Sequence, residues 1–495
     1  MGVLLAEAHQ VSQAVVMKAR VLLFRALSSF LLPEKILVGG LSQVGSFDGR
    51  AQAYSAMVVP LLRPIVEASE GWQEWQRATQ EQRNSQPWEA CVEQLDLLGV
   101  TSSCRILSGL CGSLTGTPSK VKRVLKEAMS PALAIAASLV PPLLSPLSTG
   151  ATSKELTGAA SSLLELQVVV IQHFGQEVGS EFSVSAVEAL SLATAGRWTG
   201  SGTGAGATTA QSHLMVYAAT FRLLLAVVGA RSARLKTLVP QVCQLALGRL
   251  ESVGAERLLD GPALEIMPDF LKLVKMLLVT QWHCFTTSSL PQATSIASAL
   301  PPGHAQKKTL ANENMAEHFN KIMTVLHLLL TTADQRGHSP FGPMTWAGLG
   351  AGIQEQQGPP SVPPDVARLC LEVLDEADHT VGLFRFTPFS DVWLETFLTD
   401  ALLGLGEGEH PTLQEEIRSL VFRLAEVDHE AFACKFLRTF LTSFYPRLGE
   451  AERETLLAPW QAGSHMDAPT FSSFLEAFFS DLAFLRSQMS SGGGT

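Results

Sequence analysis

Apolar residues near the carboxyl end of the chain recur at helical spacing in successive segments. In the first, residues 413–427, side chains three and four positions apart fall on one helix face: Leu413, Ile417, Leu420, Val421 and Leu424. Residues 430–445 carry a stripe of Phe432, Phe436, Leu437, Phe440, Leu441 and Phe444, and residues 470–487 one of Phe471, Phe474, Leu475, Phe478, Phe479 and Leu482. Because a lone amphipathic helix cannot bury its stripe, we expect these helices to stack on one another, as in an α-solenoid.

Local signals predict where the first two of these helices begin. Thr412 is followed three residues later by Glu415, which is the spacing of a capping box, and Pro411 stops any helix arriving from upstream. Asp428 precedes the second stripe and is the expected N-cap of the helix at 430–445.

The same periodicity extends over the rest of the chain, and no stretch alternates polar and apolar residues as a strand would. Further helices are predicted near residues 4–32, 51–69, 88–112, 119–140, 155–174, 183–195, 213–229, 233–252, 263–284, 313–333, 364–382 and 389–405. Successive pairs recur about every 35 to 50 residues, the range of HEAT-like repeats. The predicted fold class is all-α, an α-solenoid of HEAT/armadillo-like helical repeats.

Stretches rich in Gly, Pro, Ser or Thr interrupt this pattern near residues 196–212, 288–308 and 335–364. They are predicted to be loop insertions, and residues 490–495 a flexible tail. No stretch requires a boundary between independent domains, so residues 1–489 are predicted to form one array.

Composition narrows the possible partners. The chain has 495 residues, a net charge of −10 and only 17% charged residues. An acidic surface disfavours nucleic acid, which needs basic side chains, and favours partners with basic patches. Residues 128–153 carry no charge, but Pro141 and Pro142 would leave carbonyls unsatisfied in lipid, so we expect a buried helix there and no membrane span.

Candidate chemistry is sparse. The seven cysteines lack a CxxC pair and are expected to be reduced structural thiols, with Cys434 in the core. The glycine-rich run at 200–206 lacks the spacing of a phosphate-binding loop. His429, Glu430 and Cys434 are too few for a metal site. We therefore predict no enzyme, and no catalytic, cofactor-binding or metal-binding residue.

Two segments resemble a known family: LQEEIRSLVFRLAEVDHEAFACKFLRTFLTSF at residues 413–444 and DAPTFSSFLEAFFSDLAFLR at residues 467–486. They are similar to the C-terminal end of the exportin-6 family, within the importin-β/karyopherin family of nuclear export receptors. Residues 383–397 and 23–33 resemble it more loosely, in the same order. The resemblance implies that residues 1–489 are the C-terminal part of a HEAT-repeat exportin solenoid.

This resemblance also implies a function. Exportins bind cargo together with RanGTP, and this family is associated with actin bound to profilin, so the expected partners are RanGTP, actin, profilin and nucleoporins. The protein would then shuttle between nucleus and cytoplasm. The chain begins where the middle of an exportin would, and the family's amino-terminal repeats supply much of the Ran contact. Ran dependence is therefore in doubt if Met1 is the true start. The alternative is a HEAT-repeat scaffold for a multiprotein assembly without transport activity.

Charged residues beside the apolar stripes are the candidate partner-binding residues. They are Glu415, Glu416, Arg418, Asp428, Lys435 and Arg438. Stacked helix pairs form a concave surface on which such side chains can meet a protein cargo. The alternative is an ordinary solvated face that keeps the array soluble.

Overall fold

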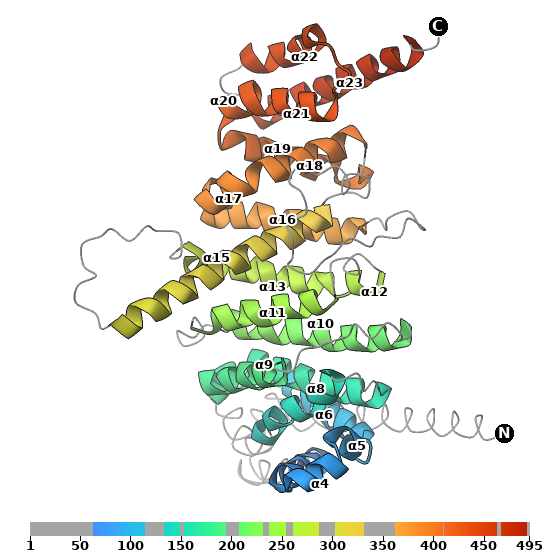
Figure 1. Ribbon diagram of the computed structural model, residues 1–495, viewed down its shortest axis with the longest axis vertical. Helices are drawn as coiled ribbons and strands as arrows, with labels where there is room; N and C mark the ends of the chain where they lie inside the picture. The colour runs from blue at the N-terminus through green and yellow to red at the C-terminus, as the bar shows by residue number, and fades with distance from the viewer. Residues whose placement is uncertain are drawn as a thin grey trace, which may run out of the picture. The chain divides into compact units, whose positions relative to one another are not determined.

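A computed structural model of the chain describes residues 63–113, 133–148, 153–194, 207–230, 237–253, 261–286, 302–330, 362–408, 410–462 and 467–492. Within these ranges every regular element is a helix, which confirms the all-α solenoid (Figure 1). Contacts divide the chain into two compact units, residues 1–253 and 254–495. The predicted helix at 4–32 and the glycine-rich run at 200–206 lie outside the described residues.

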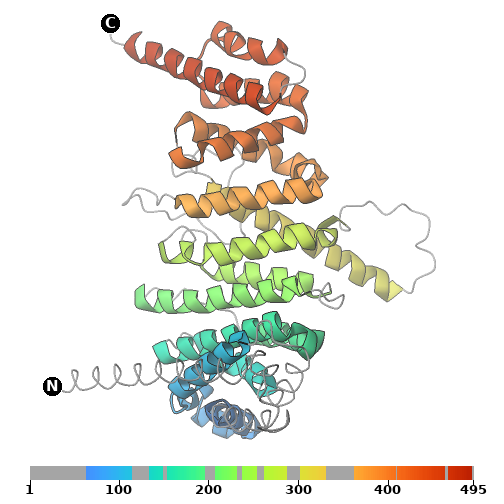
Figure 2. The same ribbon diagram turned by 180° about the vertical axis from the view of Figure 1, so that it is seen from behind.

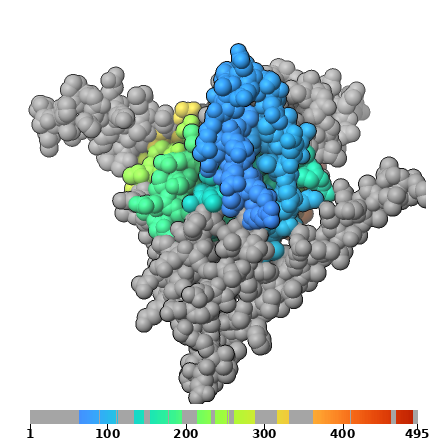
Figure 3. Space-filling model, turned by 90° about the horizontal axis from the view of Figure 1, so that it is seen from below, coloured from blue at the N-terminus to red at the C-terminus, as the bar shows by residue number. Residues whose placement is uncertain are grey.

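The first unit is organised around α9, which consists of two helical stretches joined at a kink. Its elements are helical residues 63–77 and 133–138 together with α4 (Gln80–Ser85), α5 (Trp88–Val92), α6 (Leu97–Ser113), α8 (Val140–Ser148), α9 (Lys154–Thr194), α10 (Ala207–Gly229) and α11 (Val239–Val253). Helix α9 packs against α6, α8 and α10. Residues 63–113, which include α4, α5 and α6, appear in blue in Figure 3. Buried small residues line α9, among them Ala159, Ala160 and Ser162, so its neighbours can approach closely.

The helices predicted at 155–174 and 183–195 are both present and follow one another in α9, with a non-helical kink between them at Gly179, whose φ of 75° favours glycine. One prediction for the first unit needs correction. The helix predicted to end near residue 140 is followed by α8, because Pro141 and Pro142 occupy its first turn, where proline is tolerated. None of the described helices has both the length and the apolar character that a membrane crossing requires.

The second unit stacks its helices in two layers. Its helices are α12 (Gly261–Leu264), α13 (Met267–Thr280), α14 (His283–Thr286), α15 (Pro302–Leu330), α16 (Pro364–Val381), α17 (Thr387–Val392), α18 (Leu394–Gly406), α19 (Gln414–Glu426), α20 (His429–Ala431), α21 (Leu437–Phe444), α22 (Glu450–Ala462) and α23 (Ala468–Gly492). In one layer α13 packs against α16, α16 against α19, and α19 against α23. Helices α15 and α18 form the other layer: α15 crosses in front of α13 and α16 in Figure 1 and lies behind them in Figure 2.

Several other helix boundaries differ from the sequence prediction. Helices α10 and α15 begin at Ala207 and Pro302, inside the predicted loops at 196–212 and 288–308. Helix α23 continues to Gly492, into the predicted tail. Helix α22 was missed.

The predicted apolar stripes form the core of the second unit. All members of the first stripe are buried, and so are Phe432, Leu437, Phe440, Phe471, Leu475 and Leu482. Trp460 of α22 is fully buried between the other two stripes, with its ring 5.6 Å from that of Phe432 and 5.2 Å from that of Phe471. Edge-to-face rings therefore join α20–α21, α22 and α23 into one core.

Candidate functional site

The start of α19 is built differently from the predicted capping box. Residues Pro411–Leu413 form a 3-10 turn, and His410 before it adopts a left-handed backbone (φ 47°). Thr412 therefore lies inside this turn, and no side chain caps α19. The capping-box prediction is wrong because the chain tightens into a 3-10 turn at Pro411, before the helix begins.

The Glu415 side chain instead lies beside Arg418, with Glu415 Oε1 2.7 Å from the arginine Nη1. The same nitrogen lies 3.0 Å from Glu476 Oε1, so Arg418 joins α19 to α23. Glu416 faces the other neighbour, and its Oε1 lies 3.7 Å from Nε of Arg368 in α16. Arg418 and Glu416 thus form ion pairs with adjacent helices, whereas Glu415 pairs within α19.

Asp428 has the capping role that the sequence predicted. The backbone N–H of Ala431 donates to Asp428 Oδ1 at 2.9 Å. A π-helical turn, Phe432–Phe436, then joins α20 to α21. Cys434 and Lys435 of this turn face outward, which corrects the prediction of a core thiol at Cys434, since that residue lies off the buried stripe.

Arg438 forms ion pairs within the protein, whereas Lys435 forms none among the described residues. Arg438 Nη1 lies 3.0 Å from Glu450 Oε1, and its other terminal nitrogen contacts Glu454, which ties α21 to α22. Among the described residues Lys435 forms no ion pair. Lys435 is therefore the basic member of the predicted set that is free to meet another molecule.

Sequence inspection missed the best-buried ion pair of this surface. Arg423 of α19 contacts both Asp375 and Asp378 at the end of α16, and its guanidinium lies 5.6 Å from the ring centroid of Phe384. Asp378 also accepts the backbone N–H of Phe384 at 2.9 Å. Arg423 and Asp378 are only 20% and 17% exposed. The signal was present in the outward-facing acidic residues of α16, but only the fold pairs them with α19.

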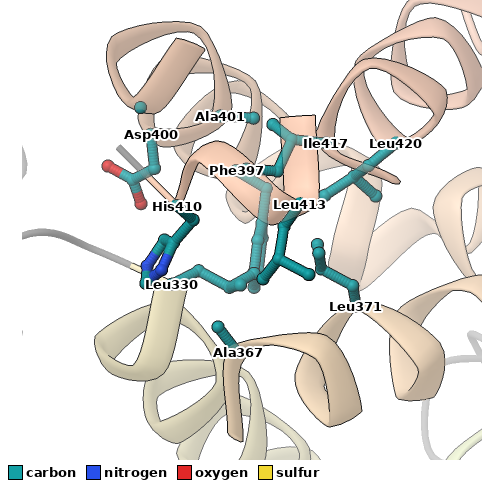
Figure 4. A pocket seen from close by; sticks show the side chains of 11 residues that line it. Leu330, Ala367, Leu371, Phe397, Asp400, Ala401, His410, Leu413, Ile417 and Leu420 are labelled. Atoms are coloured by element: carbon teal, nitrogen blue, oxygen red, sulfur yellow. The ribbon is translucent and has the colours of Figure 1, made fainter. Parts of the chain in front are cut away.

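A small cavity lies between α16, α18 and α19 (Figure 4). Its lining is mostly aliphatic: Leu330, Ala367, Leu371, Phe397, Ala401, Gly404, Leu413, Ile417 and Leu420, with Asp400 and His410 at its polar edge. Its volume is about 20 Å³, room for about one water molecule. The cavity is therefore a packing gap, too small for a metabolite.

Two histidines lie at or next to the polar edge of this cavity: His410 lines it, and His327 contacts Asp400. Asp400 pairs with Nδ1 of His327, and both side chains are largely buried. His410 is half-buried, and this burial lowers its pKa from the ordinary 6.5. Within the described part of the chain, no group of three or more His, Cys, Asp or Glu residues could hold a metal ion.

Most of the described charged side chains on α16, α19, α21 and α23 thus pair with one another. In comparisons with known proteins, residues 278–488 match the family model described as Exportin-6, C-terminal TPR repeats. The matched residues run from the end of α13 into α23 and lie within the second unit. No curated protein and no solved structure matches the chain.

Proposed function

We propose, on the premise that residues 278–488 belong to the exportin-6 C-terminal repeat family, that the protein is a nuclear export receptor. The family match supports an exportin-like transport receptor and carries this proposal. The finer proposal is that the cargo is actin or profilin–actin, carried from nucleus to cytoplasm in a RanGTP-dependent way. RanGTP and nucleoporins are then partners, and the protein shuttles between the two compartments.

Reciprocal coupling is the proposed mechanism. RanGTP and cargo each stabilise the helix arrangement that the other prefers, so each raises the affinity of the other by the same factor. GTP hydrolysis in the cytoplasm removes one partner and releases the second. Stacked helices suit this role, because small changes in the angle between neighbours add up along an array.

The proposed cargo surface consists of the charged residues that the sequence predicts to bind a partner. Lys435 is exposed without an ion pair among the described residues, and Glu415 keeps 81% of its side chain exposed beside Arg418. These two are proposed as direct contacts. Glu416, Arg418, Asp428 and Arg438 would act mainly by holding helices and turns in place, because each is already engaged within the chain.

Loss of the protein from cells tests the proposed transport. Depletion should raise the nuclear fraction of actin, measured by quantitative imaging, and re-expression of the chain should restore it. The Lys435→Glu variant should restore it less well, whereas Arg447→Glu, a matched reversal at an exposed arginine of the same unit, should restore it fully. Unchanged nuclear actin after depletion would contradict actin as the cargo.

The alternative remains a helical scaffold without transport activity. The protein would then stay in the compartment of its assembly. Fluorescence recovery after bleaching of one compartment separates the two functions. A receptor exchanges between nucleus and cytoplasm and restores the fluorescence, and a scaffold does not.

A further inference from the structure

The interface between α16 and α19 has two sets of arginine–carboxylate ion pairs, here called ties. The core between them is incompletely filled. We infer that this interface is a hinge whose angle is set by arginine–carboxylate ties, so that ionic strength changes how α16 stacks on α19. This inference concerns the fold of residues 362–462 and stands apart from the proposed transport function.

The first tie lies toward the carboxyl ends of the two helices. Arg423 of α19 holds Asp375 and Asp378 of α16 together, and one of its terminal nitrogens also donates to the carbonyl oxygen of Asp375 at 3.2 Å. Because Asp378 also accepts the N–H of Phe384, it is bound to the turn that follows α16. This tie therefore connects α19 to the backbone that follows α16, and not only to the Asp378 side chain.

The second tie lies toward the amino ends. Arg368 of α16 lies between Asp365, at 3.9 Å, and Glu416 of α19, at 3.7 Å. One tie would set only the separation of two helices. Two ties, seven or more residues apart on each helix, set the crossing angle as well.

The apolar core beneath these two ties contains a small cavity. The 20 Å³ cavity is lined by Ala367 and Leu371 of α16 and by Ile417 and Leu420 of α19. Close-packed interiors resist rotation because every side chain is held by its neighbours. A gap of this size leaves the side chains around it less tightly held than in a filled interface, so the ion pairs at its edges contribute more to the crossing angle.

Exposure determines how strongly salt acts on each tie. Arg368 and Glu416 are 43% and 44% exposed, while Arg423 and Asp378 are mostly buried. The Debye length falls from about 30 Å at 0.01 M salt to about 3 Å at 1 M, and exposed pairs are screened most. The Arg368 tie is therefore expected to weaken first, and α16 and α19 to pivot about the Arg423 tie.

A distance measurement across the hinge tests this inference. Two dyes are attached to the full chain at Lys272→Cys in α13 and Asp481→Cys in α23, which are exposed positions outside the ties. Cys91, Cys284 and Cys434 are replaced by serine, since the other cysteines are buried. We expect single-molecule energy transfer to shift and its distribution to broaden between 0.01 M and 1 M salt.

Two variants assign the response to the hinge. The double variant Arg368→Gln/Arg423→Gln should already show the shifted, broad distribution at low salt and lose most of the salt response. Arg385→Gln, at an exposed arginine without an ion pair among the described residues, should respond like the unsubstituted chain.

The salt titration of the chain with intact ties needs no ion-pair variant, so it decides the matter even if the double variant fails to fold. A distribution that does not change with salt would overturn the inference. So would an equal salt response in the chain with intact ties and in a folded double variant.

Discussion

Gln167 of α9 is fully buried, and among the described residues neither its amide nitrogen nor its amide oxygen has a hydrogen-bond partner. A buried polar group without a partner costs about 1 to 3 kcal/mol of stability. Replacement by an apolar side chain of similar shape removes that cost. We therefore expect Gln167→Met to raise the free energy of unfolding by about 1 kcal/mol or more, measured by denaturant titration.

Gln241 is the matched control for this change. Its amide donates to Ser191 Oγ at 2.6 Å, so Gln241→Met loses a hydrogen bond and should not stabilise the protein. A fall in stability for Gln167→Met would show that its side chain has a partner after all.

His410 makes stability depend on pH. Burial lowers its pKa in the folded state below the ordinary 6.5, so the folded state binds fewer protons than the unfolded state just below that pH. Its contribution is fully present above pH 6.5 and is lost as the pH falls from 6.5 through the folded-state pKa. His410→Asn, which tolerates the left-handed backbone, should reduce this acid sensitivity in melting curves from pH 7.5 to 5.

His379→Asn, at an exposed histidine of α16, is the control and should keep the original pH dependence. An unchanged acid response in His410→Asn would show that other groups cause it.

The cysteines differ in reactivity because the thiolate is the reacting form. Burial raises the pKa of Cys104 and of Cys111 to about 12, and it also raises that of Cys370. We expect a thiol reagent at pH 8 to modify exposed Cys434 of the native protein first and to leave these three unmodified, measured by peptide mass spectrometry. Rapid labelling of Cys370 would contradict its burial.

Helices with a long apolar stripe could be predicted from the sequence, and short or proline-containing ones could not. Helices α16 and α19 lie within two residues of their predicted bounds. Helix α22 was missed because Pro459 interrupts it and only Leu456, Leu457 and Trp460 mark its buried face. Proline lowers the local helical signal, and packing of Trp460 on neighbouring helices outweighs that cost.

The charged surface was predictable only in part, for a similar reason. Asp428 could be assigned as a cap because capping depends on residues three positions apart. Arg418 and Arg423 each pair with a carboxylate on another helix, about 50 residues away in sequence. Sequence spacing alone does not show which helices become neighbours. Arg418 was therefore predicted to face a partner protein, and the Arg423 ion pair was missed.

Two glycines of α18 offer a test of packing at the level of elements. A methyl group at Gly406 would lie 3.0 Å from Cε1 of Phe479 in α23, closer than carbon atoms normally pack. A methyl group at Gly404 would point into the gap. Gly406→Ala should lower the free energy of unfolding by about 1 kcal/mol or more. Gly404→Ala should raise it by about 0.5 to 1 kcal/mol, because alanine favours helix.

Thermal and denaturant unfolding of the two variants measures this difference. An equal effect of both substitutions would mean that α23 does not pack against the end of α18 as described.

At the scale of the whole molecule, many charged side chains of the described second-unit helices join those helices to one another, which leaves few of the described ones for a partner. Of the predicted set, Lys435 is exposed and forms no ion pair among the described residues, and Glu415 is 81% exposed although it pairs with Arg418. The match of residues 278–488 to the family model of exportin-6 C-terminal repeats is what supports the proposal of nuclear export. Coupling between two partners is the property that distinguishes an export receptor from a scaffold.

The most direct test of that claim is a binding measurement with purified components. The full chain is titrated with profilin–actin in the presence of Ran locked with GTP, of Ran bound to GDP, and without Ran. We predict that GTP-locked Ran tightens cargo binding by about 5- to 150-fold, the usual range for coupled sites, and that GDP-bound Ran has no effect. Equal affinity in all three conditions would contradict the account and leave the helical scaffold as the better description.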